Sequence, residues 1–129
     1  MRVLALDYGS ARTGVAISDP SGTIATPIGV VERASTSDGL AQLEAIVREQ
    51  DVERVVVGLP LTPRGEVGEQ ARETLAFAEA LGELLSVPVE FYDERFTTTL
   101  AAGAGGAAEE DARAAAFLLE SYLRRAVGA

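Results

Sequence analysis

The sequence predicts an α/β protein in which a mixed five-stranded sheet is flanked by helices on both faces. Three β-rich runs follow one another within the first 32 residues, and two more alternate with segments of helical periodicity. Arg54 to Leu59 (RVVVGL) is an unbroken apolar run, as expected for a central strand that is buried on both faces. Strands that first meander and then alternate with helices are typical of a mixed sheet covered on both sides.

The first two runs predict a hairpin with an acid at its mouth. Val3 to Leu6 is apolar and ends in Asp7, and Gly9 supplies a turn. Thr13 to Ile17 then returns as the second strand, with Gly14 where the two backbones would need to come close. Asp7 therefore lies at the carboxyl edge of the sheet, where open α/β folds bind ligands. Capping of a turn is the alternative role that this segment leaves open for Asp7.

The next elements are a third strand and a first helix. Thr23 to Glu32 is β-rich, and Pro27 within it is tolerable only near a sheet edge or a bulge. Ser35 to Asp38 offers residues that cap helix N-termini. Apolar residues then recur at helical spacing at Leu40, Leu43, Ile46 and Val47.

After the central strand, the chain alternates between helix and strand. Pro60 to Gly68 is a Pro- and Gly-rich loop, and a second helix is indicated by period-3.6 repetition at Ala71, Leu75, Ala78, Leu81 and Leu85. Val87 to Tyr92 is the last predicted strand. Ala101 to Ala108 is a Gly/Ala-rich segment expected to be flexible, and Glu109 to Arg125 is an amphipathic final helix.

Composition limits the chemistry available to the 129 residues, which we expect to form one domain (1–129). The chain has no Cys and no His, which excludes thiolate chemistry, zinc sites and imidazole-based catalysis. All eleven basic residues are Arg, so a Schiff base or the lysine of a phosphate-binding P-loop is excluded as well. No apolar stretch approaches the roughly 20 residues that span a bilayer, and no basic signal-peptide region opens the chain, so we expect a soluble, cytoplasmic protein.

The candidate chemistry rests on acids at the ends of elements. Asp7 closes the first strand, Asp93 and Glu94 follow the last strand, and Asp111 opens the final helix. If the first strand is central, these carboxylates converge at one sheet edge, where Mg²⁺ or Mn²⁺ would relieve their repulsion. Two such ions about 4 Å apart can hydrolyse phosphodiesters without His or Cys. Strand alternation puts only one acid of the 93–94 pair on the side of Asp7, and we favour Glu94 over Asp93 as the metal ligand.

Simpler interpretations of these acids stay open. Taken alone, Asp111, with Glu109 and Glu110, is better explained as a favourable charge at a helix N-terminus. Asp93 and Glu94 fit a surface turn or a salt bridge to Arg95.

Three arginines are candidates for binding substrate phosphates. Arg12 lies in the same hairpin as Asp7, Arg64 lies on the loop after the central strand, and Arg95 follows the acid pair. The net charge of −9 nevertheless predicts weak, salt-sensitive binding of nucleic acid unless arginines cluster on one face and a metal ion bridges to the phosphate.

Four blocks, in this order, resemble the YqgF family, also called RuvX, of ribonuclease H-like nucleases, and the resemblance covers nearly the whole chain. They are LALDYGSARTGVAISD (4–19), VVVGLPLTPRGEVGEQA (55–71), DERFTT (93–98) and DARAAAFLLESYL (111–123). The resemblance implies a ribonuclease H-like fold and a metal-dependent nuclease with Asp7, Asp111 and an acid of the 93–94 pair in its active site. Members of this family are described both as Holliday junction resolvases and as nucleases that mature the 5′ end of the small-subunit ribosomal RNA precursor.

Two departures from the family pattern concern nucleic-acid binding. Ala11 stands where the family often has a basic residue, so Arg12 alone would meet a phosphate there. The segment from Thr99 to Asp111 is short and acidic, whereas it is usually longer and basic in the family. Both departures predict weaker binding of structured RNA or branched DNA.

Two other function classes compete with the nuclease. The hairpin also resembles the first phosphate loop of actin-like ATPases and sugar kinases, but those proteins need two such domains to enclose ATP. The second alternative is a catalytically idle module that binds nucleic acid or a protein. The apolar stripe of the final helix is only wide enough to pack on the sheet, so we expect a monomer or a weak homodimer.

Overall fold

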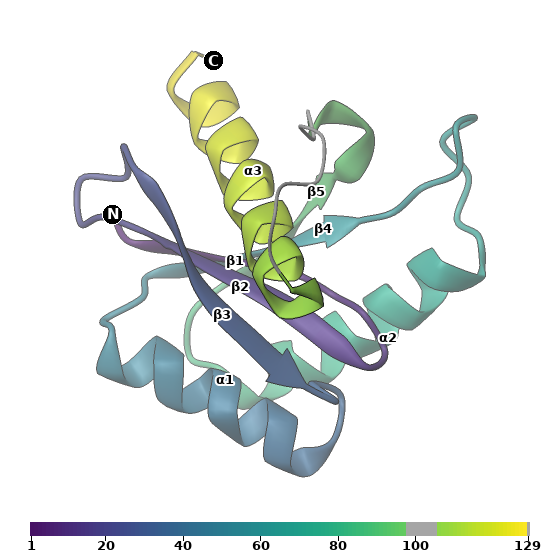
Figure 1. Ribbon diagram of the computed structural model, residues 1–129, viewed down its shortest axis with the longest axis horizontal. Coiled ribbons are helices and arrows are strands. Elements are labelled where there is room, and N and C mark those ends of the chain that lie inside the picture. Colours follow the sequence, from purple (N-terminus) through teal and green to yellow (C-terminus); the bar gives the residue numbers. More distant parts are fainter. Residues whose placement is uncertain (98–105, 129) are drawn as a thin grey trace.

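In a computed structural model that describes residues 1–97 and 106–128, five strands form one mixed sheet (Figure 1). The strands are β1 (Val3–Asp7), β2 (Arg12–Ser18), β3 (Ala25–Glu32), β4 (Arg54–Leu59) and β5 (Val89–Asp93). Their spatial order is β3-β2-β1-β4-β5. β2 pairs antiparallel with both β1 and β3, whereas β4 pairs parallel with both β1 and β5. The predicted sheet is confirmed, and β1 lies at its centre.

Helices cover both faces of this sheet, as predicted. α1 (Ser37–Glu49) and α2 (Glu69–Leu84) lie on one face and α3 (Ala107–Gly128) crosses the other, while a short 3₁₀ helix, η1 (Glu94–Phe96), follows β5 (Figure 1). Side chains of β1 alternate between the two layers because successive residues of a strand point to opposite faces. Leu4 and Leu6 pack in the cluster on the α1 and α2 side, whereas Val3 and Ala5 pack with α3.

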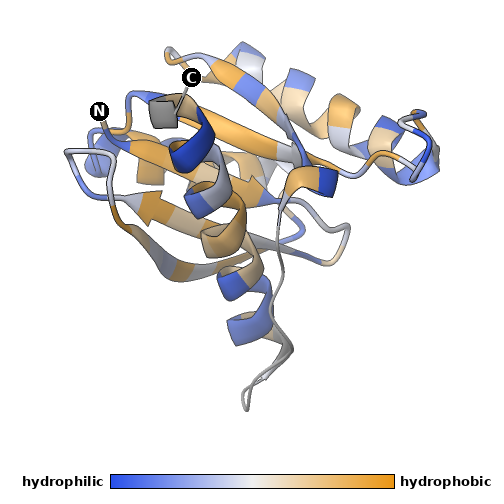
Figure 2. Ribbon diagram, turned by 90° about the horizontal axis from the view of Figure 1, so that it is seen from above, coloured by the Kyte–Doolittle hydropathy of each residue, from blue (hydrophilic) through white to orange (hydrophobic). Residues whose placement is uncertain are grey.

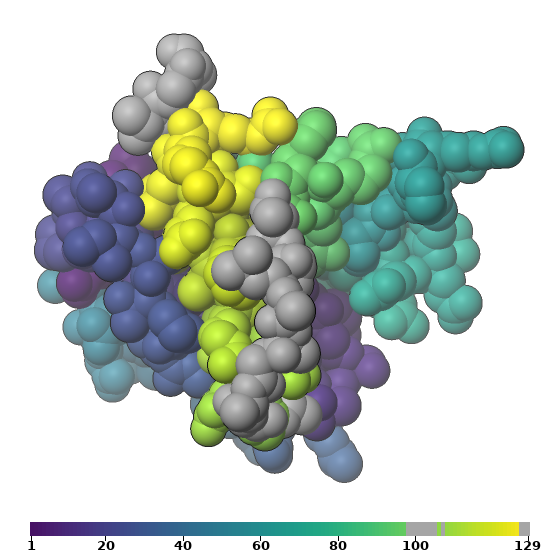
Figure 3. All heavy atoms as spheres, turned by 45° about the horizontal axis from the view of Figure 1, so that its top comes forward, coloured from purple at the N-terminus to yellow at the C-terminus, as the bar shows by residue number. Residues whose placement is uncertain are grey.

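The final helix is part of the core. Its buried residues pack on the sheet in one cluster with β1, β4 and Tyr92, and they are Ala115, Ala116, Leu118, Leu119 and Leu123. Figure 2 shows hydrophobic middle turns and hydrophilic ends in α3. In Figure 3 the atoms of α3 run across the middle of the molecule, between those of β3 and β5. None of the helices in the described part of the chain is long and apolar enough to cross a membrane.

Pro27 and the cap of the first helix lie where their chemistry predicts. β3 is an edge strand, and its register against β2 shifts next to Ala16, whose partner is Pro27. A proline without an N–H is tolerated at such a place. The first helix begins after Thr36, whose side-chain Oγ1 accepts a hydrogen bond of 3.1 Å from the N–H of Gly39.

Two predicted boundaries are wrong in ways that matter for the site. The last strand runs from Val89 to Asp93 instead of Val87 to Tyr92, so Glu94 begins η1 directly after the strand. The final helix begins at Ala107 rather than Glu109, so Asp111 is its fifth residue and lies beyond the first turn. Most of the segment predicted to be flexible, and most of 99–111, lies outside the described residues.

Candidate active site

Asp7 ends the central strand on the face that α3 covers. It follows Val3 and Ala5 in the alternation of β1, and both of those residues pack against the α3 cluster. Its backbone partner in β2 is Gly14. The structure therefore places this carboxylate at the carboxyl edge of the sheet, partly buried beneath the helix.

Glu94 reaches Asp7 from β5 by crossing the strand between them. β4 separates β1 from β5, and its residue at the crossing point is Gly58. A Cβ atom on Gly58 would lie 2.6 Å from Glu94 Oε1, so only glycine leaves room for the glutamate there. The two carboxyl groups share a side-chain hydrogen bond.

This pair holds a proton at neutral pH. Burial is the largest cause that raises the pKa of Glu94, to about 8, and the neighbouring Asp7 raises it further. Burial and the charge of Asp111 also raise the pKa of Asp7, although its hydrogen bond from Glu94 acts in the opposite direction. Two buried carboxyl groups in contact repel each other when both are ionised, so the pair keeps one proton.

Because folded Glu94 binds this proton, we expect the stability of the protein in EDTA to fall as the pH rises. Folded Glu94 has a pKa of about 8 against an ordinary value of 4.5, so the folded chain binds a proton that the unfolded chain lacks between those values. This stabilisation is complete below 4.5 and is lost as the pH rises through 8. We expect the Tm to fall between about pH 5 and pH 8 in thermal unfolding. Glu94→Gln should flatten the profile, and parallel profiles for the two proteins would contradict the shared proton.

Asp111 lies next to the pair but is bound to an arginine. Its backbone rests on β2 at Gly14, where a Cβ atom would lie 1.9 Å from the carbonyl oxygen of Asp111. Its side-chain Oδ2 accepts a hydrogen bond of 2.8 Å from Arg12 Nε, which makes an ion pair. The close approach at Gly14 is thus between strand and helix, not between the two hairpin backbones as the sequence suggested.

Asp93 is turned to Arg95 rather than to Asp7. The ion pair measures 2.6 Å from Arg95 Nη2 to Asp93 Oδ2, and this hydrogen-bonding partner is the largest cause that lowers the pKa of Asp93. Arg95 also donates to the carbonyl oxygen of Pro63 and lies against Gly65, whose φ of 84° favours glycine. Arg95 thereby ties η1 to the loop after β4, and Arg64 is exposed on that loop.

A pocket of about 290 Å³ opens over the acid pair. Its lining comprises Asp7, Glu94, Thr97, Ala114 and Leu118, so it lies between the sheet edge and α3. The Oγ1 of Thr97 is buried and has no hydrogen-bond partner among the described residues. No three acids within the described ranges lie close enough together to hold one metal ion. Sequence reasoning missed both Thr97 and Gly58, for which the only signal was their place at the ends of elements.

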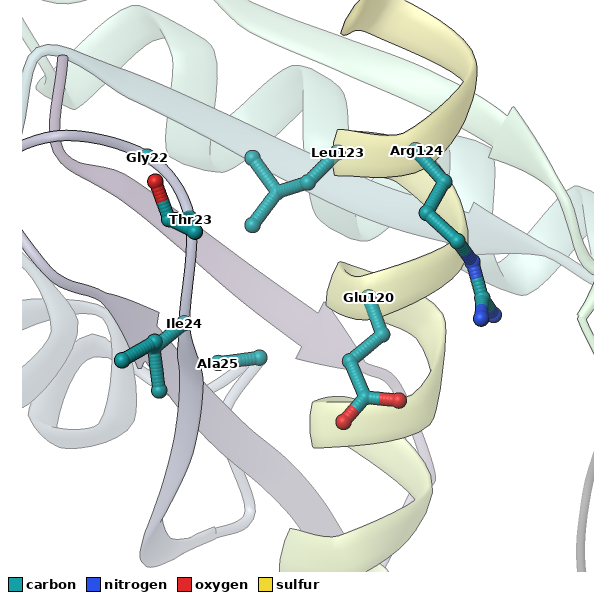
Figure 4. A pocket seen from close by; sticks show the side chains of 7 residues that line it. All are labelled: Gly22, Thr23, Ile24, Ala25, Glu120, Leu123 and Arg124. Carbon is teal, nitrogen blue, oxygen red and sulfur yellow. The ribbon is translucent and has the colours of Figure 1, made fainter. Parts of the chain in front are cut away.

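A larger hollow lies at the other end of α3. It measures about 470 Å³ and is lined by Gly22, Thr23, Ile24, Ala25, Glu120, Leu123 and Arg124 (Figure 4). Glu120 is the single acid among these lining residues, and the side chains of Glu120 and Arg124 extend from the helix rather than gathering at one point (Figure 4). The acid pair therefore makes the smaller pocket the better candidate for chemistry.

The comparison with known proteins identifies the family of the chain. The family model described as RuvX, Holliday junction resolvase, matches residues 1–125. The chain belongs to the RuvX family. The "Putative pre-16S rRNA nuclease" of Chloroflexus aurantiacus strain J-10-fl is 43% identical over 130 residues, which cover 94% of this chain and 85% of the relative. The protein of the same name from Clostridium novyi is 39% identical over 132 residues, with 95% and 98% covered.

Solved structures confirm the ribonuclease H-like fold expected for RuvX members. Thermus thermophilus RuvC in complex with a Holliday junction substrate superposes with a TM-score of 0.65 over 99% of this chain and 97% of RuvC. The sequence identity is 17%, so this likeness concerns the fold. The predicted family and enzyme class are confirmed, because RuvX members and their relatives are described as nucleases, which are hydrolases of phosphodiester bonds.

Proposed function

We propose that this RuvX member is a metal-dependent endonuclease that hydrolyses phosphodiester bonds of structured nucleic acid at the Asp7–Glu94 pocket. The observation that carries the proposal is the buried, hydrogen-bonded carboxyl pair at the carboxyl edge of the sheet, with Asp111 beside it. Relatives named for pre-16S rRNA and for Holliday junctions support a precursor RNA or a branched DNA as the substrate. We further propose that residues 1–129 act as one domain in the cytoplasm.

The residues present fit a Mg²⁺ or Mn²⁺ ion. Asp7 and Glu94 offer only oxygen donors, which these hard ions prefer, and their mutual repulsion would be relieved by a cation. Asp7 and Glu94, which line the pocket, would hold the metal, and Asp111 would join them once its side chain leaves Arg12. When bound, such an ion polarises the scissile phosphate and lowers the pKa of a water molecule.

The chain's own residues then supply binding and orientation. Asp7 and Glu94 line the pocket where the phosphodiester is expected to lie, and their shared proton would pass to solvent water when both carboxylates bind a cation. Arg12, Arg64 and Arg95 are the guanidinium groups that we propose hold the substrate backbone. The buried hydroxyl of Thr97, which has no partner within residues 1–97 and 106–128, can donate to an oxygen in the pocket.

The deciding experiment is a cleavage assay on two substrates. A four-way DNA junction and a precursor rRNA fragment are incubated with the protein in Mn²⁺, in Mg²⁺ and in EDTA. We expect cleavage of at least one substrate with either metal, none in EDTA, and less cleavage as salt is added, because salt cations compete with the arginines for the phosphates. The better substrate separates RNA maturation from junction resolution, and no cleavage of either would favour the idle binding module.

We also propose that the protein is a monomer or a weak homodimer. The apolar stripe of α3 is already buried against the sheet, which leaves that helix little apolar surface for a partner. Light scattering at micromolar concentration should therefore give a mass near 13.5 kDa. A stable dimer would contradict this and would favour junction resolution, since two symmetric nicks need two active sites.

A further inference from the structure

Arg12 is the side chain that holds Asp111 in this structure. It is the first residue of β2, and its guanidinium makes an ion pair with an acid 99 residues later in the chain. The side chains are 42% and 34% exposed, so water and other anions can reach both. The ion pair lies beside the Asp7–Glu94 pair rather than within it.

The backbone of Asp111 is already in place next to the acid pair. Its carbonyl oxygen rests over Gly14, and Gly14 is the strand partner of Asp7. The backbone of Asp111 thus lies over the strand partner of Asp7, while its side chain is bound to Arg12.

We propose that Arg12 is a positioning residue that keeps Asp111 away from the metal until a phosphate of the nucleic acid takes over the guanidinium. The inference rests on the proposed function and deepens it. Arg12 can pair with Asp111 or with a substrate phosphate, and Asp111 can pair with Arg12 or with a cation. When a phosphate binds Arg12, Asp111 is free to bind the cation, and when the cation binds Asp111, Arg12 is free to bind a phosphate. Metal and nucleic acid therefore raise each other's affinity by the same factor.

The first test measures Mn²⁺ affinity by calorimetry, without substrate, in four proteins: wild type, Arg12→Gln, Asp111→Asn and the double variant. Arg12→Gln should tighten Mn²⁺ binding by about two- to fivefold, the range expected when an exposed ion pair no longer competes. Arg12→Gln also removes a positive charge near the site, which by itself tightens Mn²⁺ binding, and this effect remains when Asp111 is Asn. The coupling between Arg12 and Asp111 is therefore the effect of Arg12→Gln in wild type minus its effect in the Asp111→Asn protein.

The second test measures nucleic-acid affinity in EDTA, where no cleavage can occur, with a fluorescein-labelled four-way DNA junction. Asp111→Asn should tighten binding by about two- to fivefold because it frees Arg12, and this gain should shrink when Arg12 is Gln. Glu110→Gln is the matched control, since it removes one negative charge from the neighbouring exposed residue of the same helix.

The outcomes separate this inference from the proposed function. Equal tightening by Arg12→Gln in both backgrounds, or weaker Mn²⁺ binding, overturns the role of Arg12 but leaves the metal site intact. Absence of Mn²⁺ binding in all four proteins overturns both. Equal gains for Asp111→Asn and Glu110→Gln in the second test overturn the exchange with phosphate.

Discussion

Asp7→Asn is expected to lower nuclease turnover by at least about a thousandfold, because Asp7 lies at the floor of the pocket and contacts Glu94 directly. Cleavage of the better of the two substrates in Mn²⁺ measures the effect, and calorimetry should show Mn²⁺ binding lost or much weakened. Asp38→Asn is the matched control. It makes the same substitution at an exposed residue of α1, on the other face of the sheet.

The same variant should keep its fold. Asparagine has nearly the same shape as aspartate and carries no buried charge, so Asp7→Asn should unfold in EDTA at pH 7 no earlier than wild type. This separates loss of chemistry from loss of structure. Wild-type cleavage by folded Asp7→Asn would falsify the assignment and place the activity at another site or in a contaminant.

Gly14→Ala is expected to destabilise the fold by about 3 kcal/mol or more, an overpacking cost at the upper end of the usual range. The new Cβ atom would lie 1.9 Å from the carbonyl oxygen of Asp111 and 3.2 Å from the backbone nitrogen of Ala112, so α3 has to move away from β2. Urea unfolding gives the change in the free energy of unfolding. The displaced helix should also lose the Arg12–Asp111 ion pair.

The control for this substitution is Gly82→Ala. Gly82 lies inside α2, and no atom would lie within 4 Å of its new Cβ atom. Alanine should therefore stabilise that helix by about 0.5–1 kcal/mol, because it fixes less backbone entropy than glycine does. A similar effect of the two substitutions would show that helix α3 does not press on Gly14.

The sequence was enough to predict the sheet, its covering helices and the sheet edge at which Asp7 lies. Unbroken apolar runs at β1 and β4 are strong local signals, and the end of a strand at Asp7 follows from the first of them. The four family blocks predicted the family, which the comparison confirms. Whether Glu94, Asp93 or Asp111 carries the chemistry remains a prediction.

The remaining features depend on contacts between distant segments, which no local pattern records. In the sequence, Gly58 has the pattern of an ordinary residue in a buried strand. Its role depends on Glu94, whose side chain lies against it in the structure. The partner of Asp111 is 99 residues away, so its ion pair with Arg12 has no sequence signal. Helix propensity also misplaced the start of α3, because alanines next to glycines looked like a flexible segment.

The docking of α3 links the hydrophobic core to the proposed chemistry. Among the described elements this helix is the cover of one sheet face, and the same helix carries Asp111 and the pocket residues Ala114 and Leu118 (Figure 1). A fluctuation that lifts its first turns would open the site and expose the apolar surface beneath at the same time. Ligands that bridge α3 and the sheet edge would therefore slow amide hydrogen exchange along the helix. Without a ligand, the equilibrium between the docked and the lifted helix would determine the fraction of molecules in which the site is formed.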